Sequence, residues 1–231
     1  MKIGENATGF IKAAAGSPRV HPGEPMKNAA EICSVIDQAE ALKADVLVLP
    51  ELVLSGYTAA DLFLRAPLLE GVLTALECIK DHLKRPESEG LIVVLGAPIR
   101  ADGRLFNCAV FLQNGRVLGI VPKSHLPNYQ EFYEARWFSP ASEAVSSTLE
   151  LLGDTVPFGT DLIFESASGL AIAAEICEDL WVAQPPATAA AAAGANVIVN
   201  LSASNETAGK AKFRRELVRL QSARSMCAYV Y

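Results

Sequence analysis

The sequence predicts an α/β fold, because short apolar runs rich in β-branched residues alternate with longer stretches of helical periodicity. With 231 residues, of which 51% are hydrophobic and 20% charged, the chain is long enough to bury one large core. Nothing in its composition divides the chain, and no internal repeat is visible. We therefore expect a single domain that spans residues 1–231.

In the first half of the chain, helices are expected to cover a mixed sheet. A strand is expected at 8–15, and a helix is expected after Asn28. The apolar residues of this helix recur at helical spacing and should share one face; they are Ile32, Val35, Ile36, Ala39 and Leu42. The following elements are a strand at 45–49, a helix at 67–84, and strands at 91–100, 105–113 and 116–121. An Asp-Gly and an Asn-Gly dipeptide predict hairpin turns around 105–113.

In the second half, the sheet is expected to continue with strands at 161–165, 170–176 and 196–201. Residues 187–195 predict a buried, alanine-rich helix. A polar segment at 202–210 leads into another helix, whose apolar positions are Phe213, Leu217, Leu220 and Met226. Residues 227–231 begin a further strand.

Composition and charge exclude several classes of partner. The net charge of -6 gives no reason to expect nucleic acid or an anionic membrane. The five cysteines are dispersed and lack a C-x-x-C spacing, which argues against both a disulfide framework and a zinc site. The 187–195 stretch is far shorter than the roughly 20 residues that cross a bilayer. We expect a cytoplasmic protein that binds no metal, membrane or nucleic acid.

The strand-like run 171–176 ends abruptly on Cys177, which is followed by two carboxylates. A cysteine at a strand tip can serve as a nucleophile. Its ordinary pKa of about 8.5 means that it needs a base or a cation nearby at neutral pH. Most lone cysteines in apolar runs are core residues, so this assignment depends on finding such partners.

Two other apolar runs end on candidate partners. The run at 45–50 precedes Glu51, the expected general base, and the run at 116–122 precedes Lys123, the expected cation. Considered singly, a glutamate or a lysine in such a place is more often a solvated surface residue. The same layout at three strand ends favours a catalytic site.

The sequences around these residues resemble the nitrilase, or carbon-nitrogen hydrolase, superfamily, which uses a Glu-Lys-Cys triad in this chain order. The similarity runs from about Thr8 to the C-terminus. It rests on Pro-Glu-Leu-Val-Leu-Ser-Gly-Tyr around Glu51, Lys-Ser-His-Leu-Pro-Asn-Tyr from Lys123, and Glu-Ile-Cys-Glu-Asp-Leu-Trp around Cys177. The resemblance implies a four-layer α-β-β-α sandwich, a homo-oligomer, and a second glutamate, Glu134, that holds the lysine.

Within this superfamily the motifs are similar to glutaminase domains that supply ammonia to a synthetase domain. This implies L-glutamine as the substrate and a set of substrate-binding residues, which are Tyr57, Tyr129, Glu178, Ser204 and Lys210. It implies no cofactor here, with ATP and Mg²⁺ used only in the synthetase domain, whose Ser-Gly-Gly-x-Asp-Ser loop is not in this sequence. Relatives continue the domain past Tyr231, so we expect a C-terminally truncated chain.

Two alternatives stay open. The first is a stand-alone amidase of the same superfamily that acts on another small amide. The second is a catalytically silent binding or assembly module that keeps the fold. A Cys-His pair with His125 is a further way to activate a thiol, but the glycines that flank the cysteine in that class are absent around Cys177. The intact Glu51, Lys123 and Cys177 set favours an enzyme.

Overall fold

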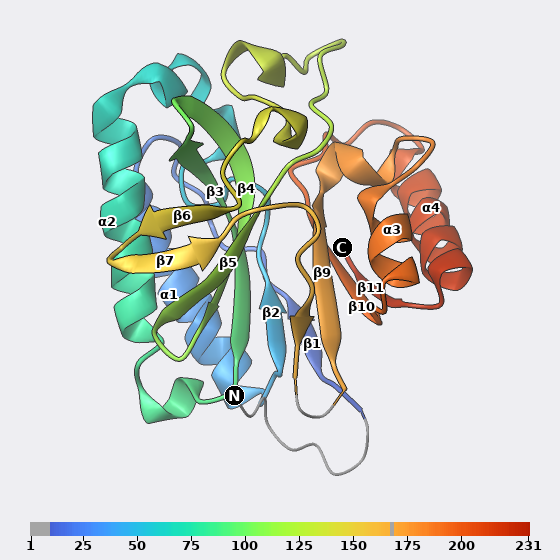
Figure 1. Ribbon diagram of the computed structural model, residues 1–231, viewed down its shortest axis with the longest axis horizontal. Coiled ribbons are helices and arrows are strands. Elements are labelled where there is room, and N and C mark those ends of the chain that lie inside the picture. Colours follow the sequence, from blue (N-terminus) through green and yellow to red (C-terminus); the bar gives the residue numbers. More distant parts are fainter. Residues whose placement is uncertain (1–9, 167–168) are drawn as a thin grey trace.

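The computed structural model describes residues 10–166 and 169–231. Two sheets lie face to face in the middle, and a pair of helices covers the outer face of each sheet (Figure 1). The strand orders are β1-β2-β3-β4-β5 and β11-β10-β9-β8. The expected α-β-β-α sandwich is confirmed.

The five-stranded sheet and its helices contain β1 (Ala13–Ala15), α1 (Pro25–Ala41), β2 (Val46–Val48), α2 (Ala66–His82), β3 (Ile92–Ala101), β4 (Arg104–Gln113) and β5 (Arg116–Pro122). The four-stranded sheet and its helices contain β8 (Phe164–Glu165), β9 (Ala171–Ile176), α3 (Pro186–Ala192), β10 (Val197–Leu201), α4 (Lys210–Ser225) and β11 (Ala228–Val230). Within the described ranges, no helix has the length and apolarity needed to cross a membrane.

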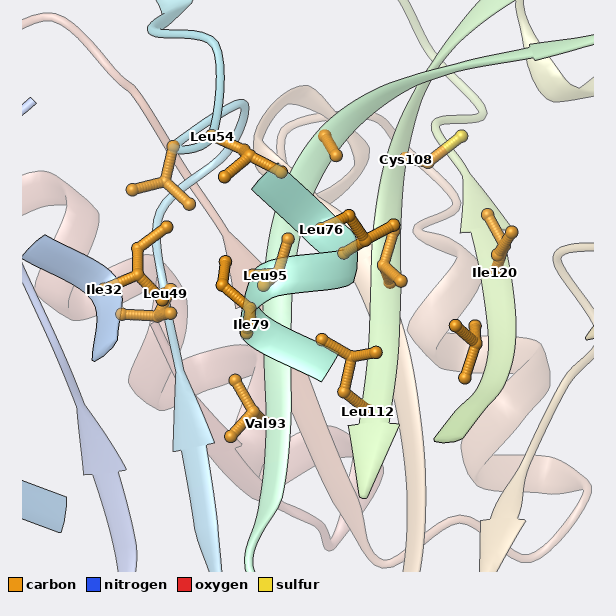
Figure 2. Close-up of a cluster of buried hydrophobic side chains, with 14 of the residues drawn as sticks. Ile32, Leu49, Leu54, Leu76, Ile79, Val93, Leu95, Cys108, Leu112 and Ile120 are labelled. Carbon is orange, nitrogen blue, oxygen red and sulfur yellow. The ribbon is translucent and has the colours of Figure 1, made fainter. Parts of the chain in front are cut away.

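Strand β3 shows why its sheet is buried on both faces. Side chains alternate along a strand, so Val93 and Leu95 face the helices, where they pack with Leu76 of α2 (Figure 2). Ile92 and Val94 face the other sheet and belong to the cluster between the two sheets. A continuous apolar run is therefore the sequence pattern of this strand, as expected for a strand buried on both sides.

The topology brings several strand ends to one edge. β1, β2 and β3 are parallel, and β9, β10 and β11 are parallel. β4 is antiparallel to both β3 and β5, so β5 points the same way as β2 and β3. Residues that follow β2 and β5 therefore emerge at the same edge of this sheet.

Helix α1 begins at Pro25, four residues before the expected start. Proline suits the first helical turn, where its missing N–H has no partner to lose. Asn28 lies inside the helix and is fully buried, where its Nδ2 donates to the backbone oxygens of His21 and Leu54. Leu42, the last residue of the expected apolar face, caps the helix and is 62% exposed.

The second pair of helices is less buried than expected. In α3 only Ala187 is buried, so the prediction of a buried alanine-rich helix is wrong. Alanine has high helix propensity without requiring burial, which explains the error. In α4 the apolar positions Phe213, Leu220 and Met226 are 56%, 68% and 91% exposed. Their helical spacing predicted the helix but not a buried face.

Some elements differ from the expected pattern. The strand expected at 161–165 shrinks to the two residues of β8. The strand expected at 8–15 is shorter too: β1 begins at Ala13, residues 10–12 are not in a strand, and residues 8 and 9 lie outside the described part. A hairpin of β6 (Thr148–Leu151) and β7 (Asp154–Pro157), and a 3₁₀ segment at Tyr57–Leu64, were not expected. Short elements of this kind have little periodicity to detect.

Gly96 on β3 lets the chain that carries Glu51 pass directly over the sheet. A Cβ built on Gly96 would lie 2.6 Å from the backbone oxygen of Pro50 and 2.7 Å from the backbone carbon of Glu51, and it would also collide with the Leu52 nitrogen. These are backbone atoms, so no side-chain rotation can relieve the clash. The backbone oxygen of Gly96 accepts a hydrogen bond from Leu54 N–H at 3.2 Å.

We expect Gly96→Ala to lower the free energy of unfolding by about 2 kcal/mol or more, because overpacking forces the backbone to shift. Urea denaturation measures this change. Gly71→Ala is the matched control, since Gly71 lies within α2 and the nearest atom to its added Cβ would be Pro25 Cγ at 3.5 Å, an ordinary contact. That control should gain up to about 1 kcal/mol from helix propensity. Equal stabilities of the two variants would contradict the close approach at Gly96.

Candidate active site

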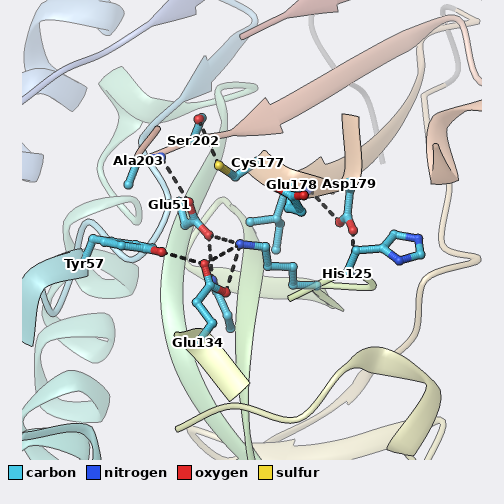
Figure 3. A network of polar contacts seen from close by, with 12 residues as sticks. Glu51, Tyr57, His125, Glu134, Cys177, Glu178, Asp179, Ser202 and Ala203 are labelled. Atoms are coloured by element: carbon cyan, nitrogen blue, oxygen red, sulfur yellow. Dashed lines mark hydrogen bonds and ion pairs between the residues drawn. The ribbon is translucent and has the colours of Figure 1, made fainter. Parts of the chain in front are cut away.

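Three side chains converge at the aligned strand ends. Glu51 follows β2, Lys123 follows β5 and Cys177 follows β9. All three are buried, with exposed fractions of 2%, 0% and 7%. Figure 3 shows the polar contacts that join this region. The three candidates from the sequence therefore come from both sheets and meet where the sheets' ends face each other.

The Lys123 ammonium lies between two carboxylates. Its Nζ is 2.6 Å from Glu51 Oε1, and 2.7 and 2.9 Å from the two oxygens of Glu134. Burial lowers the pKa of Lys123, but the charges of Glu51 and Glu134 outweigh it and hold this pKa above its ordinary value. The lysine is therefore a permanent cation at neutral pH.

Glu134 lies beside the lysine, as the resemblance implied. Burial, followed by the charge of Glu51, raises the pKa of Glu134 to about 7, although Lys123 opposes this shift. The hydroxyl of Tyr57 donates to Glu134 Oε1 at 2.7 Å. Tyr57 therefore contacts the supporting glutamate through its polar end, and its expected contact with substrate stays a prediction.

The Cys177 thiol sits in a dry environment. Burial and the neighbouring Glu51 raise its pKa to about 12, while Lys123 and the Ser202 hydroxyl lower it. Ser202 Oγ donates to Cys177 Sγ at 3.4 Å, and Cys177 N–H donates to Asn200 Oδ1 at 3.0 Å. The resting cysteine is consequently a neutral thiol that must lose its proton as it reacts.

Cys177 adopts a left-handed backbone conformation, with φ of 46°. It is the point where β9 turns sharply into the short 3₁₀ segment Cys177–Leu180. Non-glycine residues in this region are strained by about 1–3 kcal/mol. The chain therefore makes a sharp turn at the candidate nucleophile although neither neighbouring residue is a glycine.

Asp179 joins the cysteine turn to the lysine loop. Its carboxylate accepts hydrogen bonds from the N–H groups of Ile176 at 2.9 Å, His125 at 2.8 Å and Ser124 at 3.4 Å. Burial raises the pKa of Asp179 to about 7 despite these donors. His125 contributes its backbone to this contact, while its ring points away from the network (Figure 3).

Glu51 accepts two further hydrogen bonds. Asn107 Nδ2 donates to Oε1 at 2.7 Å, and the Ala203 N–H donates to Oε2 at 3.0 Å. Ala203 and Ser202 are adjacent residues that follow β10, so one loop contacts the carboxylate through its backbone and the thiol through a side chain. The loop that begins here also carries Ser204 and leads to Lys210.

The remaining candidates for substrate binding form the rim of the site. The hydroxyl of Tyr129, which is 51% exposed, donates to the Glu178 carboxylate at 3.0 Å. Lys210 Nζ lies 5.2 Å from the ring centroid of Trp181 and donates to Asn205. Ser204 N–H donates to Ser202 Oγ at 3.2 Å. These residues are arranged near the nucleophile turn, and their contact with substrate stays a prediction.

Sequence reasoning missed Asn107, Asn200 and Asp179 as parts of the site. Asp179 stood inside a quoted motif, and its position two residues after the nucleophile was an available signal. The two asparagines lie in otherwise apolar strands and are fully or almost fully buried. A polar residue in such a run costs free energy unless it is paired, which was the signal that could have marked them.

Across the described residues, no group of three or more His, Cys, Asp or Glu side chains could hold a metal ion.

Comparison with known proteins defines the class. The family model of the carbon-nitrogen hydrolases matches residues 12–231, so this chain belongs to that family. It is similar to the glutamine-dependent NAD(+) synthetase of Mycobacterium tuberculosis, with 44% identity over 96% of this chain and 32% of that protein. The chain therefore spans about a third of the length of such relatives.

Solved structures agree with the fold. A crystal structure of a glutamine-dependent NAD(+) synthetase from Cytophaga hutchinsonii has a TM-score of 0.81 and 30% identity, over 95% of this chain and 35% of that chain. An amidase from Nesterenkonia sp. has a TM-score of 0.73 over 95% of this chain and 75% of its own, with 18% identity. The second likeness shows the fold alone.

We expect Asp179 to make the stability of the domain pH-dependent. Its folded pKa of about 7 lies above the ordinary value of 3.8, so the folded state binds this proton more tightly. The contribution to stability is fully present below about pH 4 and is lost as pH rises towards 7, by at most about 1.4 kcal/mol per pH unit.

The Asp179→Asn variant cannot titrate at this position. Urea denaturation of both proteins at several pH values should therefore show the difference in unfolding free energy moving in favour of the variant between about pH 4 and 7. A difference that stays constant over this range would contradict burial as the dominant influence on Asp179.

Proposed function

We propose that this domain hydrolyses the side-chain amide of L-glutamine through a thioester on Cys177. The observation that carries the proposal is the buried contact set of Glu51, Lys123 and Glu134 next to this thiol, in a chain similar to proteins named glutamine-dependent NAD(+) synthetase. Covalent catalysis divides a difficult amide hydrolysis into two easier steps.

In the first step the Cys177 sulfur attacks the carboxamide carbon of glutamine. The thiol proton goes to Glu51 as the S–C bond forms, because a neutral thiol is a weak nucleophile. The raised pKa of Cys177 keeps it protonated until substrate arrives. Glu51 then gives the proton to the departing nitrogen, the C–N bond breaks and ammonia leaves.

Lys123 stabilises the negative oxygen of the tetrahedral intermediate. Its ammonium carries three hydrogens, and two of its three contacts go to the same Glu134 carboxylate. One hydrogen can therefore turn to the substrate oxygen without separating the lysine from either glutamate. A preorganised cation in a dry site stabilises such an oxyanion by several kcal/mol, on the order of 3. Water activated by Glu51 then hydrolyses the thioester and releases glutamate.

The rim residues offer charges of opposite sign for the two ends of an amino acid. Glu178 suits the α-ammonium group, while Lys210 suits the α-carboxylate, with Ser204 and Tyr129 as hydrogen-bonding neighbours. Tyr57 would contact the substrate next to Glu134, to which its hydroxyl donates a hydrogen bond. This arrangement favours glutamine over a small amide without charged ends.

The ammonia would serve a separate synthetase domain that uses ATP and Mg²⁺ to convert nicotinic acid adenine dinucleotide to NAD. The relatives' name and their greater length support this part of the proposal. The complete proposal is a cytoplasmic homo-oligomer that uses ammonia from glutamine to make NAD. The glutaminase domain itself would need no cofactor.

Ammonia release from glutamine tests the proposal. We expect Cys177→Ala to lower it by at least about 10³-fold, because the covalent route is lost. Cys108→Ala is the control, since Cys108 is also buried but lies in the core on β4. Hydrolysis of small uncharged amides in preference to glutamine would favour a stand-alone amidase. No hydrolysis of any amide would favour a silent module.

We expect Lys123→Arg to lose most of the turnover, on the order of 10²-fold or more, despite the retained charge. The lysine is fully buried between Glu51 and Glu134, and a planar guanidinium needs more room and a different geometry. Steady-state kinetics of Lys123→Arg and Lys123→Ala measure the effect. Full activity of the arginine variant would show that the site requires only positive charge.

A further inference from the structure

Asn107 is a buried polar residue in the middle of β4 that no sequence motif marked. It has no exposed surface. Its backbone oxygen accepts the Lys123 N–H at 2.8 Å, and its side-chain Nδ2 donates to Glu51 Oε1 at 2.7 Å. The same residue therefore contacts the strand end that carries the lysine and the carboxylate of the expected base.

Packing alone does not explain an asparagine at this position. Ala109 and Phe111, two and four residues further along the strand, belong to the apolar cluster between the sheets. Asn107 Oδ1 is buried, and none of the described residues offers it a hydrogen bond. An unpaired buried oxygen is unfavourable, so an apolar residue would suit the core better. The hydrogen bond to Glu51 is what distinguishes asparagine here.

The two oxygens of Glu51 are used unequally. Oε1 accepts from Lys123 Nζ at 2.6 Å and from Asn107 Nδ2 at 2.7 Å. Oε2 accepts one hydrogen bond, from Ala203 N–H at 3.0 Å. A carboxylate oxygen has two lone-pair directions. Oε1 is therefore fully occupied, whereas Oε2 keeps one direction for a proton.

We propose that Asn107 is a positioning residue that, together with Lys123, occupies Glu51 Oε1 and so makes Oε2 the oxygen that takes the thiol proton. The Cys177 S–H bond breaks and the Oε2–H bond forms as sulfur bonds to the amide carbon. The same proton later passes from Oε2 to the leaving nitrogen as the C–N bond breaks. This inference rests on the proposed role of Glu51 as the base.

Gln113 provides a matched control on the same strand. It is also fully buried, its Nε2 donates to the Gly90 oxygen at 3.0 Å, and its Oε1 likewise has no hydrogen-bond partner among the described residues. It belongs to none of the contacts around Glu51. Gln113→Met and Asn107→Leu each replace a buried amide by an apolar side chain, so both variants show how the loss of such an amide affects stability. Asn107→Leu also removes a hydrogen bond to Glu51, whereas Gln113→Met does not.

The experiment follows two readouts against pH for wild type, Asn107→Leu, Asn107→Asp and Gln113→Met. The first is alkylation of Cys177 by iodoacetamide, quantified by peptide mass mapping, which needs no glutamine. The second is ammonia release from glutamine, resolved into kcat and KM. Thermal melting of each variant gives the folded fraction, so that both rates refer to folded protein.

We expect Asn107→Leu to lower kcat by about 10- to 100-fold with KM changed by less than about threefold, because proton transfer is impaired rather than binding. A carboxylate that loses a donor holds its proton more tightly, so the acid limb of both profiles should move up by about one pH unit. Asn107→Asp, which places a second carboxylate beside Glu51, should move the acid limb of both profiles to still higher pH. Gln113→Met should keep the wild-type profiles.

Unshifted profiles in both Asn107 variants, or equal shifts in Gln113→Met, would overturn the proposal. If Asn107→Leu does not fold, the isosteric Asn107→Asp decides alone. Shifted alkylation profiles together with no ammonia release from glutamine by wild type would support the role of Asn107 and overturn the proposed substrate. The two hypotheses can thus fail independently.

Discussion

The architecture of the site depends on one buried cation held between two carboxylates. Removing the Lys123 ammonium from water is unfavourable, and only the close oxygens of Glu51 and Glu134 make it tolerable. Glu51 reaches it because β2 and β5 end at the same edge and because Gly96 lets the Glu51 backbone lie against the sheet, while Glu134 approaches from the 3₁₀ segment Glu134–Arg136. Loss of Lys123 would leave two carboxylates buried without their cation, and loss of either glutamate would leave the lysine with a single carboxylate. The fold and the ion cluster consequently constrain each other.

The charge arrangement also separates roles among chemically similar groups. Glu134 meets the lysine with both oxygens and also accepts a hydrogen bond from the Tyr57 hydroxyl. Glu51 shares only one oxygen with the lysine and lies beside the thiol loop. Two glutamates with the same neighbour therefore differ in their surroundings, because Glu51 contacts the loop that also contacts the thiol. Hydrogen bonding, more than residue type, assigns these functions.

The sequence predicted the fold and the polar side chains that meet at the strand ends, for identifiable physical reasons. Long apolar runs such as β3 and the helical period of α2 identified the major elements, and Glu51, Lys123 and Cys177 all end such runs. The exposure of Phe213 could not be predicted, because periodicity shows which residues share a face but not what covers that face. Asn107 escaped notice because its partner is 56 residues away, and only the folded chain brings them together.

The left-handed turn at Cys177 has a consequence for how such a domain can change over evolutionary time. Glycine adopts this conformation without the strain that a side chain causes, about 1–2 kcal/mol. A glycine at this position would therefore favour the folded backbone while removing the nucleophile. Stability and chemistry exert opposite pressures on the same residue. Under the proposed mechanism, a descendant freed from selection for activity therefore has a short path to an inert but more stable protein.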